Sequence, residues 1–149
     1  GIGSSPVGGN TYSWSPTSGL SSSTVANPTA NPTSTTTYTV TVTNASSCTA
    51  TDAVTVTVNS LPTANAGSDQ SICNGGGTGI GSSPVGGNTY SWSPTTGLSS
   101  STVANPTASP TSTTIYTVTV TNASSCTATD AVTVTVNSLP TANAGSDQS

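Results

Sequence analysis

The chain has 149 residues, of which 61 are Ser or Thr, and it contains no Lys, Arg, His, Met or Phe. Its four Asp residues give a net charge of −4. Without a cation the chain cannot neutralise phosphates by charge, which disfavours nucleic-acid binding and attraction to anionic membranes. No apolar run approaches the roughly 20 residues of a membrane span, and no His or Lys is present to activate a serine nucleophile. We therefore expect no enzyme, no cofactor and no membrane insertion.

The first predicted strand covers residues 11–15, where Tyr12 and Trp14 share one face and Pro16 ends the strand. The following segment, up to residue 35, carries only isolated apolar residues among Asn-Pro and Ser/Thr turns, and it is expected to form irregular edge structure.

Two further strands are predicted at residues 37–43 and 53–58, because apolar residues alternate there with threonines. The residues between them, NASSCTATD, are rich in turn formers and predict a hairpin with a longer loop. No stretch has apolar residues at helical spacing, and β-branched residues dominate, so essentially no helix is expected.

The sequence repeats itself with an offset of 78 residues, so that the stretch starting at Gly1 begins again at Gly79 and runs to Ser149. Only three aligned pairs differ, namely Ser18/Thr96, Asn31/Ser109 and Thr37/Ile115. Solenoid repeats are shorter, at about 20 to 50 residues, so each repeat is expected to be one small domain. The predicted core combines the inward positions of both copies: Tyr12, Trp14, Tyr38, Val40, Val42, Trp92, Tyr116, Val118 and Val120.

Several motifs together resemble the immunoglobulin-like and PKD-like repeats of large secreted surface proteins of Bacteroidota. They are the aromatic strand around Trp92, the strand with Tyr116, Val118 and Val120, the turn at residues 126–130, and the lead-in at residues 66–70. The Trp-Asp-Phe-Gly-Asp-Gly type motif of PKD domains is missing, so the immunoglobulin-like label is preferred. The resemblance implies tandem immunoglobulin-like β-sandwich domains of about seven strands, without enzymatic activity.

The domain boundaries follow from the linker Asn-Ser-Leu-Pro, which occurs at residues 59–62 and again at 137–140. Residues 1–60 are then a module without its first strand, and residues 61–138 are a complete module. Residues 139–149 are the first strand of a following module. The two ends of the chain are therefore complementary fragments.

The cysteines are few and fall at two positions of the repeat. The resemblance implies a disulfide between Cys73 and Cys126, which lie in the same module, and it leaves Cys48 unpaired or intermolecular. Pairing of Cys48 with Cys73 is the alternative. Structural disulfides would place the protein outside the cytoplasm. A metal site is not expected, because the chain has no His and no close pair of cysteines.

Two surface features remain. Asn44 and Asn122 begin N-glycosylation sequons in predicted loops. Ile115 replaces Thr37 on an outward face of a strand, which favours a contact between subunits.

The leading hypothesis is a structural subunit of an extracellular filament, stalk or surface fibre, whose partners are copies of itself. In its sharper form, residues 139–149 of one unit complete residues 1–60 of the next by strand donation. A continuous tandem-repeat polypeptide is the rival explanation for the same ends. The alternative function is an adhesin or glycan-binding repeat of the cell surface, and an enzyme accessory module is a third.

Overall fold

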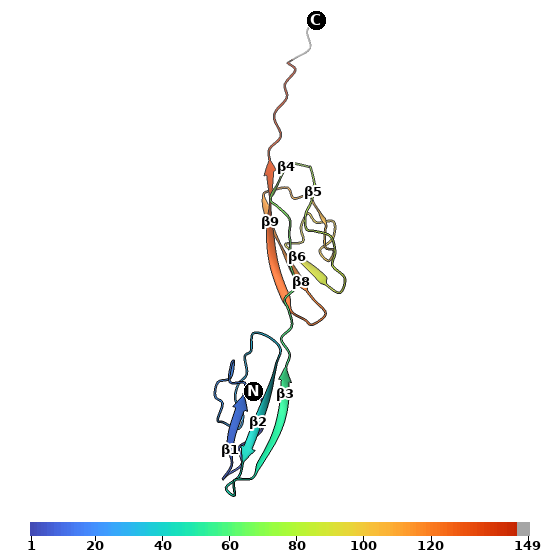
Figure 1. The fold of residues 1–149 in the computed structure, drawn as a ribbon. Helices are drawn as coiled ribbons and strands as arrows, with labels where there is room; N and C mark the ends of the chain where they lie inside the picture. The colour runs from blue at the N-terminus through green and yellow to red at the C-terminus, as the bar shows by residue number, and fades with distance from the viewer. Residues whose placement is uncertain (146–149) are drawn as a thin grey trace. The chain divides into compact units, whose positions relative to one another are not determined.

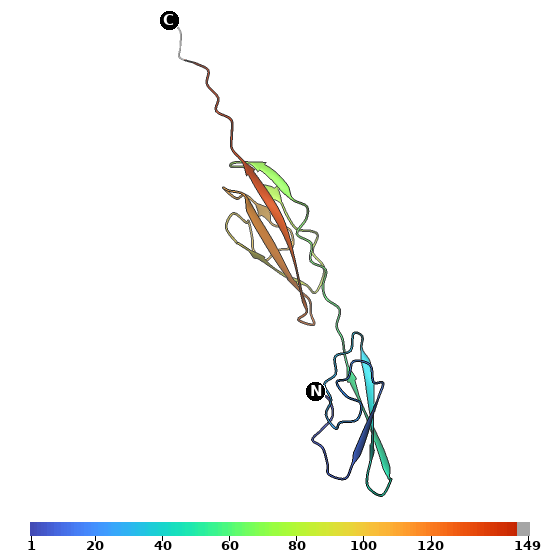
Figure 2. The same ribbon diagram turned by 90° about the vertical axis from the view of Figure 1, so that its left-hand side faces the viewer.

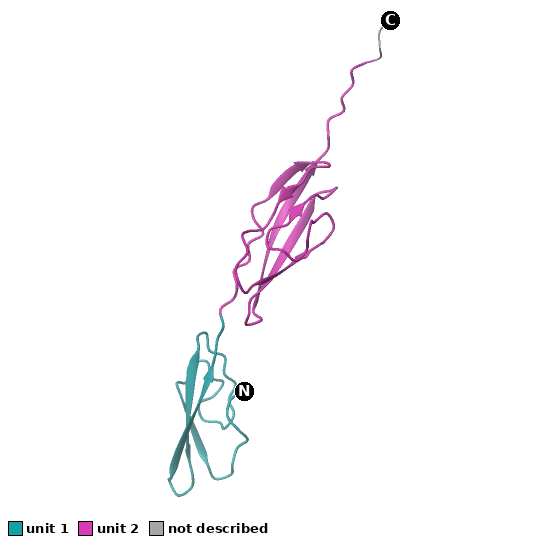
Figure 3. Cartoon of the chain, turned by 90° about the vertical axis from the view of Figure 1, so that its right-hand side faces the viewer, with its two compact units in different colours: residues 1–59 teal, residues 60–149 magenta. Residues whose placement is uncertain are grey.

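A computed structural model describes residues 1–145 and divides the chain into two compact units, Gly1–Asn59 and Ser60–Ser149 (Figure 3). All regular elements in the described part are β-strands, and none of these residues is helical. The predicted all-β class is thereby confirmed. The strands are β1 (Thr11–Ser15), β2 (Thr36–Thr43), β3 (Thr49–Val56), β4 (Gln70–Cys73), β5 (Thr78–Gly79), β6 (Thr89–Ser93), β7 (Thr107–Ala108), β8 (Thr114–Thr121) and β9 (Thr127–Asn137).

The first unit contains one antiparallel sheet with the strand order β1-β2-β3 (Figure 1). Trp14 pairs with Val40, and Tyr38 pairs with Val54, so the aromatic residues and valines share one face. The irregular segment after β1 covers this face. It is held there by Trp14, whose indole N–H donates to the Val25 carbonyl at 2.9 Å, and by Tyr38, whose hydroxyl donates to the Ser18 carbonyl at 2.7 Å.

The second unit is a two-layer sandwich. Its larger sheet has the order β4-β9-β8-β6, in which β4 runs parallel to β9 and the other neighbours are antiparallel. The smaller sheet is the β5-β7 pair, extended by a bridge between Leu98 and Ala108. Figures 1 and 2 show the second unit from two sides. The core between the layers consists of Ala66, Ile72, Ile80, Trp92, Ala108, Tyr116, Val118, Val120, Val132 and Val134.

The hairpin loop is shorter than the sequence predicts. Thr43 pairs with Thr49, so only residues 44–48 form the turn, and the strand that was expected from residue 53 begins at Thr49. The Asn44 side chain closes the turn, because its Oδ1 accepts the backbone N–H groups of Ser46 and Cys48, each at 3.0 Å. Ser47 adopts φ 61° within this turn. The same geometry recurs at Asn122 in the second unit.

The first strand of the second unit lies later in the sequence than expected. Residues 61–69, called the lead-in segment from here on, join no sheet, and the ladder to β9 begins at Gln70. In the C-terminal copy of this segment, residues 139–145 form no strand, and residues 146–149 of the expected strand lie outside the described residues.

Candidate functional site

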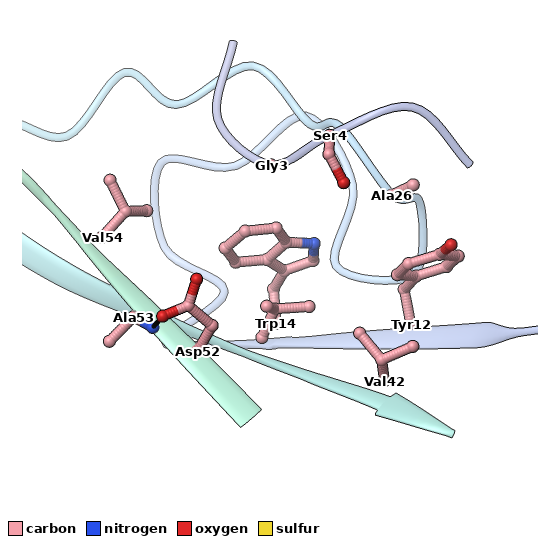
Figure 4. A pocket seen from close by; sticks show the side chains of 10 residues that line it. Gly3, Ser4, Tyr12, Trp14, Ala26, Val42, Asp52, Ala53 and Val54 are labelled. Atoms are coloured by element: carbon pink, nitrogen blue, oxygen red, sulfur yellow. Dashed lines mark hydrogen bonds between the residues drawn. The ribbon is translucent and has the colours of Figure 1, made fainter. Parts of the chain in front are cut away.

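The first unit has an open groove of about 430 Å³ above its sheet (Figure 4). Figure 4 shows the Trp14 ring and the Asp52 carboxylate side by side in this groove. Asp52 comes from β3, and its Oδ1 accepts the N–H of the neighbouring Ala53 at 2.9 Å, the one hydrogen bond of this carboxylate among residues 1–145. The groove is lined by Gly3, Ser4, Tyr12, Trp14, Ala26, Val40, Val42, Asp52, Ala53 and Val54.

The equivalent place in the second unit is filled by the lead-in segment. Ala66 is fully buried there, its N–H donates to Oδ2 of Asp130 at 2.8 Å, and its carbonyl accepts the N–H of Gly81 at 2.8 Å. Asp130 is the repeat equivalent of Asp52, and Gly81 that of Gly3. The backbone of the lead-in is therefore held by a carboxylate and a backbone N–H, and the first unit has the equivalents of both in Asp52 and Gly3.

A second carboxylate fixes the far end of the lead-in. Oδ1 of Asp69 accepts the backbone N–H of Thr133 at 2.8 Å. Directly after it, Gln70 pairs with Val134, and the parallel ladder continues to the pair of Cys73 and Asn137. Charge-assisted hydrogen bonds of this kind are worth about 1.5 to 3 kcal/mol each. Asp69 and Asp130 thus anchor the lead-in reciprocally, one from each side.

The exposure of the sheet valines differs between the unit that contains the lead-in segment and the unit that does not. Val118, Val120, Val132 and Val134 are buried in the second unit, whereas their equivalents Val40, Val42, Val54 and Val56 remain partly exposed. None of the three substitutions between the repeats falls on these positions or on the groove lining. The difference therefore comes from the lead-in segment, which covers one sheet and leaves the other open.

The burial of the predicted core residues follows the same difference between the two units. Those that the structure buries are Trp14, Tyr38, Trp92, Tyr116, Val118 and Val120. Tyr12, Val40 and Val42 face inward but are half-buried, because they border the open groove. The hydroxyl of Tyr12 also accepts the N–H of Val7 at 2.8 Å.

The predicted disulfide between Cys73 and Cys126 is wrong, and all three cysteines are free thiols. Cys73 lies beside Asn137, at the end of β9, whereas Cys126 directly precedes Thr127, the first residue of β9. The chain advances 11 residues from Cys126 to Asn137, the partner of Cys73, which separates the two ends by about 36 Å at about 3.3 Å per residue. A disulfide requires Cα atoms about 4.4 to 6.8 Å apart, so the two thiols of one module cannot meet.

The two sequon asparagines are structural residues of the hairpin turns. Asn122 uses its Oδ1 within the turn, and its Nδ2 donates to the carbonyl of Ser60 at 2.9 Å, where the chain enters the unit. Asn44 organises its own turn in the same way and lies beside an exposed Cys48. An N-linked sugar on Asn122 would replace a hydrogen of Nδ2, the atom that binds Ser60.

Ile115 lies on the outward face of β8, opposite Thr133, and its side chain is 61% exposed. In the first unit the same position is Thr37, whose hydroxyl forms a hydrogen bond of 2.8 Å with that of Thr55. The second unit therefore has a solvent-exposed apolar side chain where the first has a polar pair.

Among residues 1–145, no three His, Cys, Asp or Glu side chains form a group that could hold a metal ion. The described residues also form no helix that could span a membrane.

No protein-family model matches the chain, and comparison with curated proteins finds no similar sequence. Solved structures give distant similarities. Domains 4 and 5 of the S-layer protein SbsC match at 18% identity and a TM-score of 0.32, over 87% of this chain and 70% of that one. The human desmocollin-1 ectodomain matches at 14% identity and a TM-score of 0.36, over 88% and 34%. The Bacteroides ovatus protein SGBP-B matches at 17% identity and a TM-score of 0.25, over 86% and 38%. These scores are low, and the fold assignment rests on the sheets of the chain itself.

Proposed function

We propose that the chain is a non-enzymatic structural subunit of an extracellular filament, stalk or surface fibre, built from near-identical β-sandwich modules. Within this fibre, the lead-in segment of one copy fills the groove of the next by strand donation. One observation carries the proposal: the groove of the first unit has the same residues as the site that holds residues 61–71 in the second unit. The chain carries a second copy of that segment at residues 139–149.

The contacts available to a donated segment are those of the second unit. Ala144 corresponds to Ala66, so its N–H would donate to Asp52 and its carbonyl would accept from Gly3. Asp147 corresponds to Asp69, and its carboxylate would accept the N–H of Thr55, the equivalent of Thr133. Covering a partly exposed valine contributes up to about 1.5 to 3 kcal/mol, and strand addition supplies backbone hydrogen bonds as well.

The extracellular location rests on the resemblance to secreted repeats, since the free cysteines remove the argument from an intramodule disulfide. Ile115 is the candidate for a lateral contact between copies, because its exposed side chain has no polar role on the outward face.

The test is assembly of the 149-residue chain under reducing conditions, followed by light scattering and electron microscopy at rising concentration. We expect filaments, and we expect a peptide with the sequence of residues 61–72 to shorten them by occupying free grooves. The same peptide with an A66L substitution is the matched control and should not act. Monomers at every concentration would overturn strand donation. Density in native material that continues covalently past Ser149 into another module would replace it with a continuous array.

A glycan-binding role is the second candidate, favoured by the aromatic residues Tyr12 and Trp14 in the groove lining. Against it, the Trp14 side chain is only 3% exposed, so it offers little face for stacking on a sugar. If a glycan binds the chain and the peptide of residues 61–72 displaces it, the groove is a glycan-binding site, and this result would support glycan binding in place of the filament role.

A further inference from the structure

The two cysteine positions of a module lie at opposite ends of its longest strand. Cys73 ends β4 and pairs with Asn137, the last residue of β9. Its side chain points outward, because it follows the buried Ile72 in an alternating strand. Cys126 lies at the other end, in the hairpin turn. A module therefore has one thiol where the chain leaves it and another where the chain enters.

The entering chain is tied to the hairpin turn. The Asn122 side chain donates to the Ser60 carbonyl at 2.9 Å, and the Oδ1 of the same side chain accepts the N–H of Cys126 at 3.0 Å. The thiol at the entry end is thus two hydrogen bonds away from the linker residue that precedes the lead-in.

The linker residue Ser138 is the repeat equivalent of Ser60, and it directly follows Asn137, the partner of Cys73. When residues 139–149 fill the groove of another copy, Ser138 takes the place of Ser60 at that copy's hairpin turn. That turn contains Asn44 and Cys48 in place of Asn122 and Cys126. Cys73 of the donor and Cys48 of the acceptor then lie on either side of the same linker residue.

We propose that Cys73 of one copy and Cys48 of the next form an intermolecular disulfide that closes each junction of the assembled fibre. This disulfide rests on the proposed head-to-tail assembly of copies, and it would link neighbouring copies covalently. Both thiols are exposed, so an oxidant can reach them. A disulfide requires Cα atoms about 4.4 to 6.8 Å apart, so forming it would need a change in the two backbone dihedrals of the linker residue.

The reaction is thiol–disulfide exchange with a small-molecule disulfide such as oxidised glutathione. The thiolate of one cysteine attacks a sulfur of the oxidant, and one glutathione thiolate leaves. The thiolate of the second cysteine attacks the protein sulfur of the mixed disulfide and releases the other glutathione. Two protein thiols are oxidised, two glutathione molecules are formed, and the two thiol protons go to solvent or to the departing thiolates.

The experiment assembles the chain under reducing conditions, records light scattering, and then replaces the reductant with oxidised glutathione before electrophoresis without reductant. We expect a ladder of covalent oligomers and a cross-linked peptide that joins Cys48 to Cys73. C48S and C73S should each abolish the ladder. C126S is the matched control: it alters the equivalent turn of the second unit, whose site is already filled by the lead-in of its own chain, so the ladder should persist.

The two proposals fail differently. Normal scattering without the ladder, or a ladder that depends on Cys126, would overturn the disulfide and leave strand donation standing. Absence of assembly in reductant would overturn strand donation and this inference with it. Circular dichroism of each variant confirms that the serine substitutions, which lie at exposed or turn positions, leave the sheets folded.

Discussion

Val54 and Val132 occupy the same position of the repeat and pair with equivalent tyrosines, yet Val54 is 37% exposed and Val132 is 1% exposed. The strands that carry them are identical in sequence, and the nearest substitution, Thr37/Ile115, lies on the outward face of the sheet, away from these valines. The lead-in segment covers Val132 and has no counterpart over Val54. The exposed valine thus marks the surface that a donated segment would bury.

Replacing Asp52 with alanine should weaken assembly. The substitution removes the acceptor that corresponds to Asp130, and it leaves one N–H of the docked segment without a partner. A loss of about 1.5 to 3 kcal/mol corresponds to a dissociation constant roughly 10- to 150-fold higher. Sedimentation velocity under reducing conditions measures this dissociation constant. T51A alters the adjacent outward residue and should assemble normally, whereas unchanged assembly of D52A would exclude this contact.

Replacing Ala144 with leucine should block donation. Ala66, its equivalent, is fully buried in the filled site, which leaves no room for a larger side chain. Overpacking of about 1 to 3 kcal/mol would reduce the affinity by roughly 5- to 150-fold. T141L introduces the same side chain three residues earlier, at a position whose equivalent, Thr63, is exposed. Equal light scattering from A144L and T141L would show that the segment does not enter the groove.

The sequence predicts most of the antiparallel strands, because threonines alternate with inward valines and aromatic residues along them. It does not predict the parallel β4–β9 pair, since the four residues QSIC are too few and too mixed to show a period. The disulfide between Cys73 and Cys126 was implied by the resemblance, and the sequence contains no information about which end of a strand each cysteine occupies.

The carboxylate anchors were also missed, since their partners lie 64 residues away in the sequence. A signal existed: the only acidic residues of the chain occur at two positions of the repeat, in a composition otherwise without charge. Such selective placement indicates a specific role, and the backbone N–H groups of Ala66 and Thr133 show what that role is.

Gly81→Ala should destabilise the second unit. Gly81 has φ 84°, and an added Cβ would meet the Ala104 carbonyl and the Trp92 ring. Strain of about 1 to 3 kcal/mol is expected, which lowers the melting temperature by about 4 to 8 °C per kcal/mol for a domain of this size. Differential scanning calorimetry measures the shift. G86A adds a methyl group in open space and should change little. Equal melting of both variants would contradict the close approach.

Tyr116 should make the second unit sensitive to alkaline pH. Burial raises the pKa of its hydroxyl above the ordinary value of 10.0, and this hydroxyl donates to the Thr96 carbonyl at 2.8 Å. The folded state therefore holds the proton more tightly than the unfolded state. Its stabilising effect is complete below pH 10 and is lost as the pH rises through the higher folded pKa. Urea unfolding between pH 8 and pH 12 measures this loss.

The matched variant is Tyr116→Phe. It should be less stable than the parent at pH 8, because the hydrogen bond to Thr96 is gone, and its stability should fall less between pH 10 and pH 12. If both proteins lose stability equally over that range, Tyr116 is not the group responsible.

The parallel pairing of β4 with β9 has a mechanical consequence. The chain enters the second unit ahead of β4 and leaves it after β9, so tension on the two ends pulls these adjacent strands in opposite directions along their length. The hydrogen bonds of the ladder from Gln70 to Cys73 are then loaded together in shear, whereas a hairpin pulled open from one end loses its bonds one at a time. Pulling β4 away from β9 therefore requires the bonds of the ladder to break together, whatever the length of the strand.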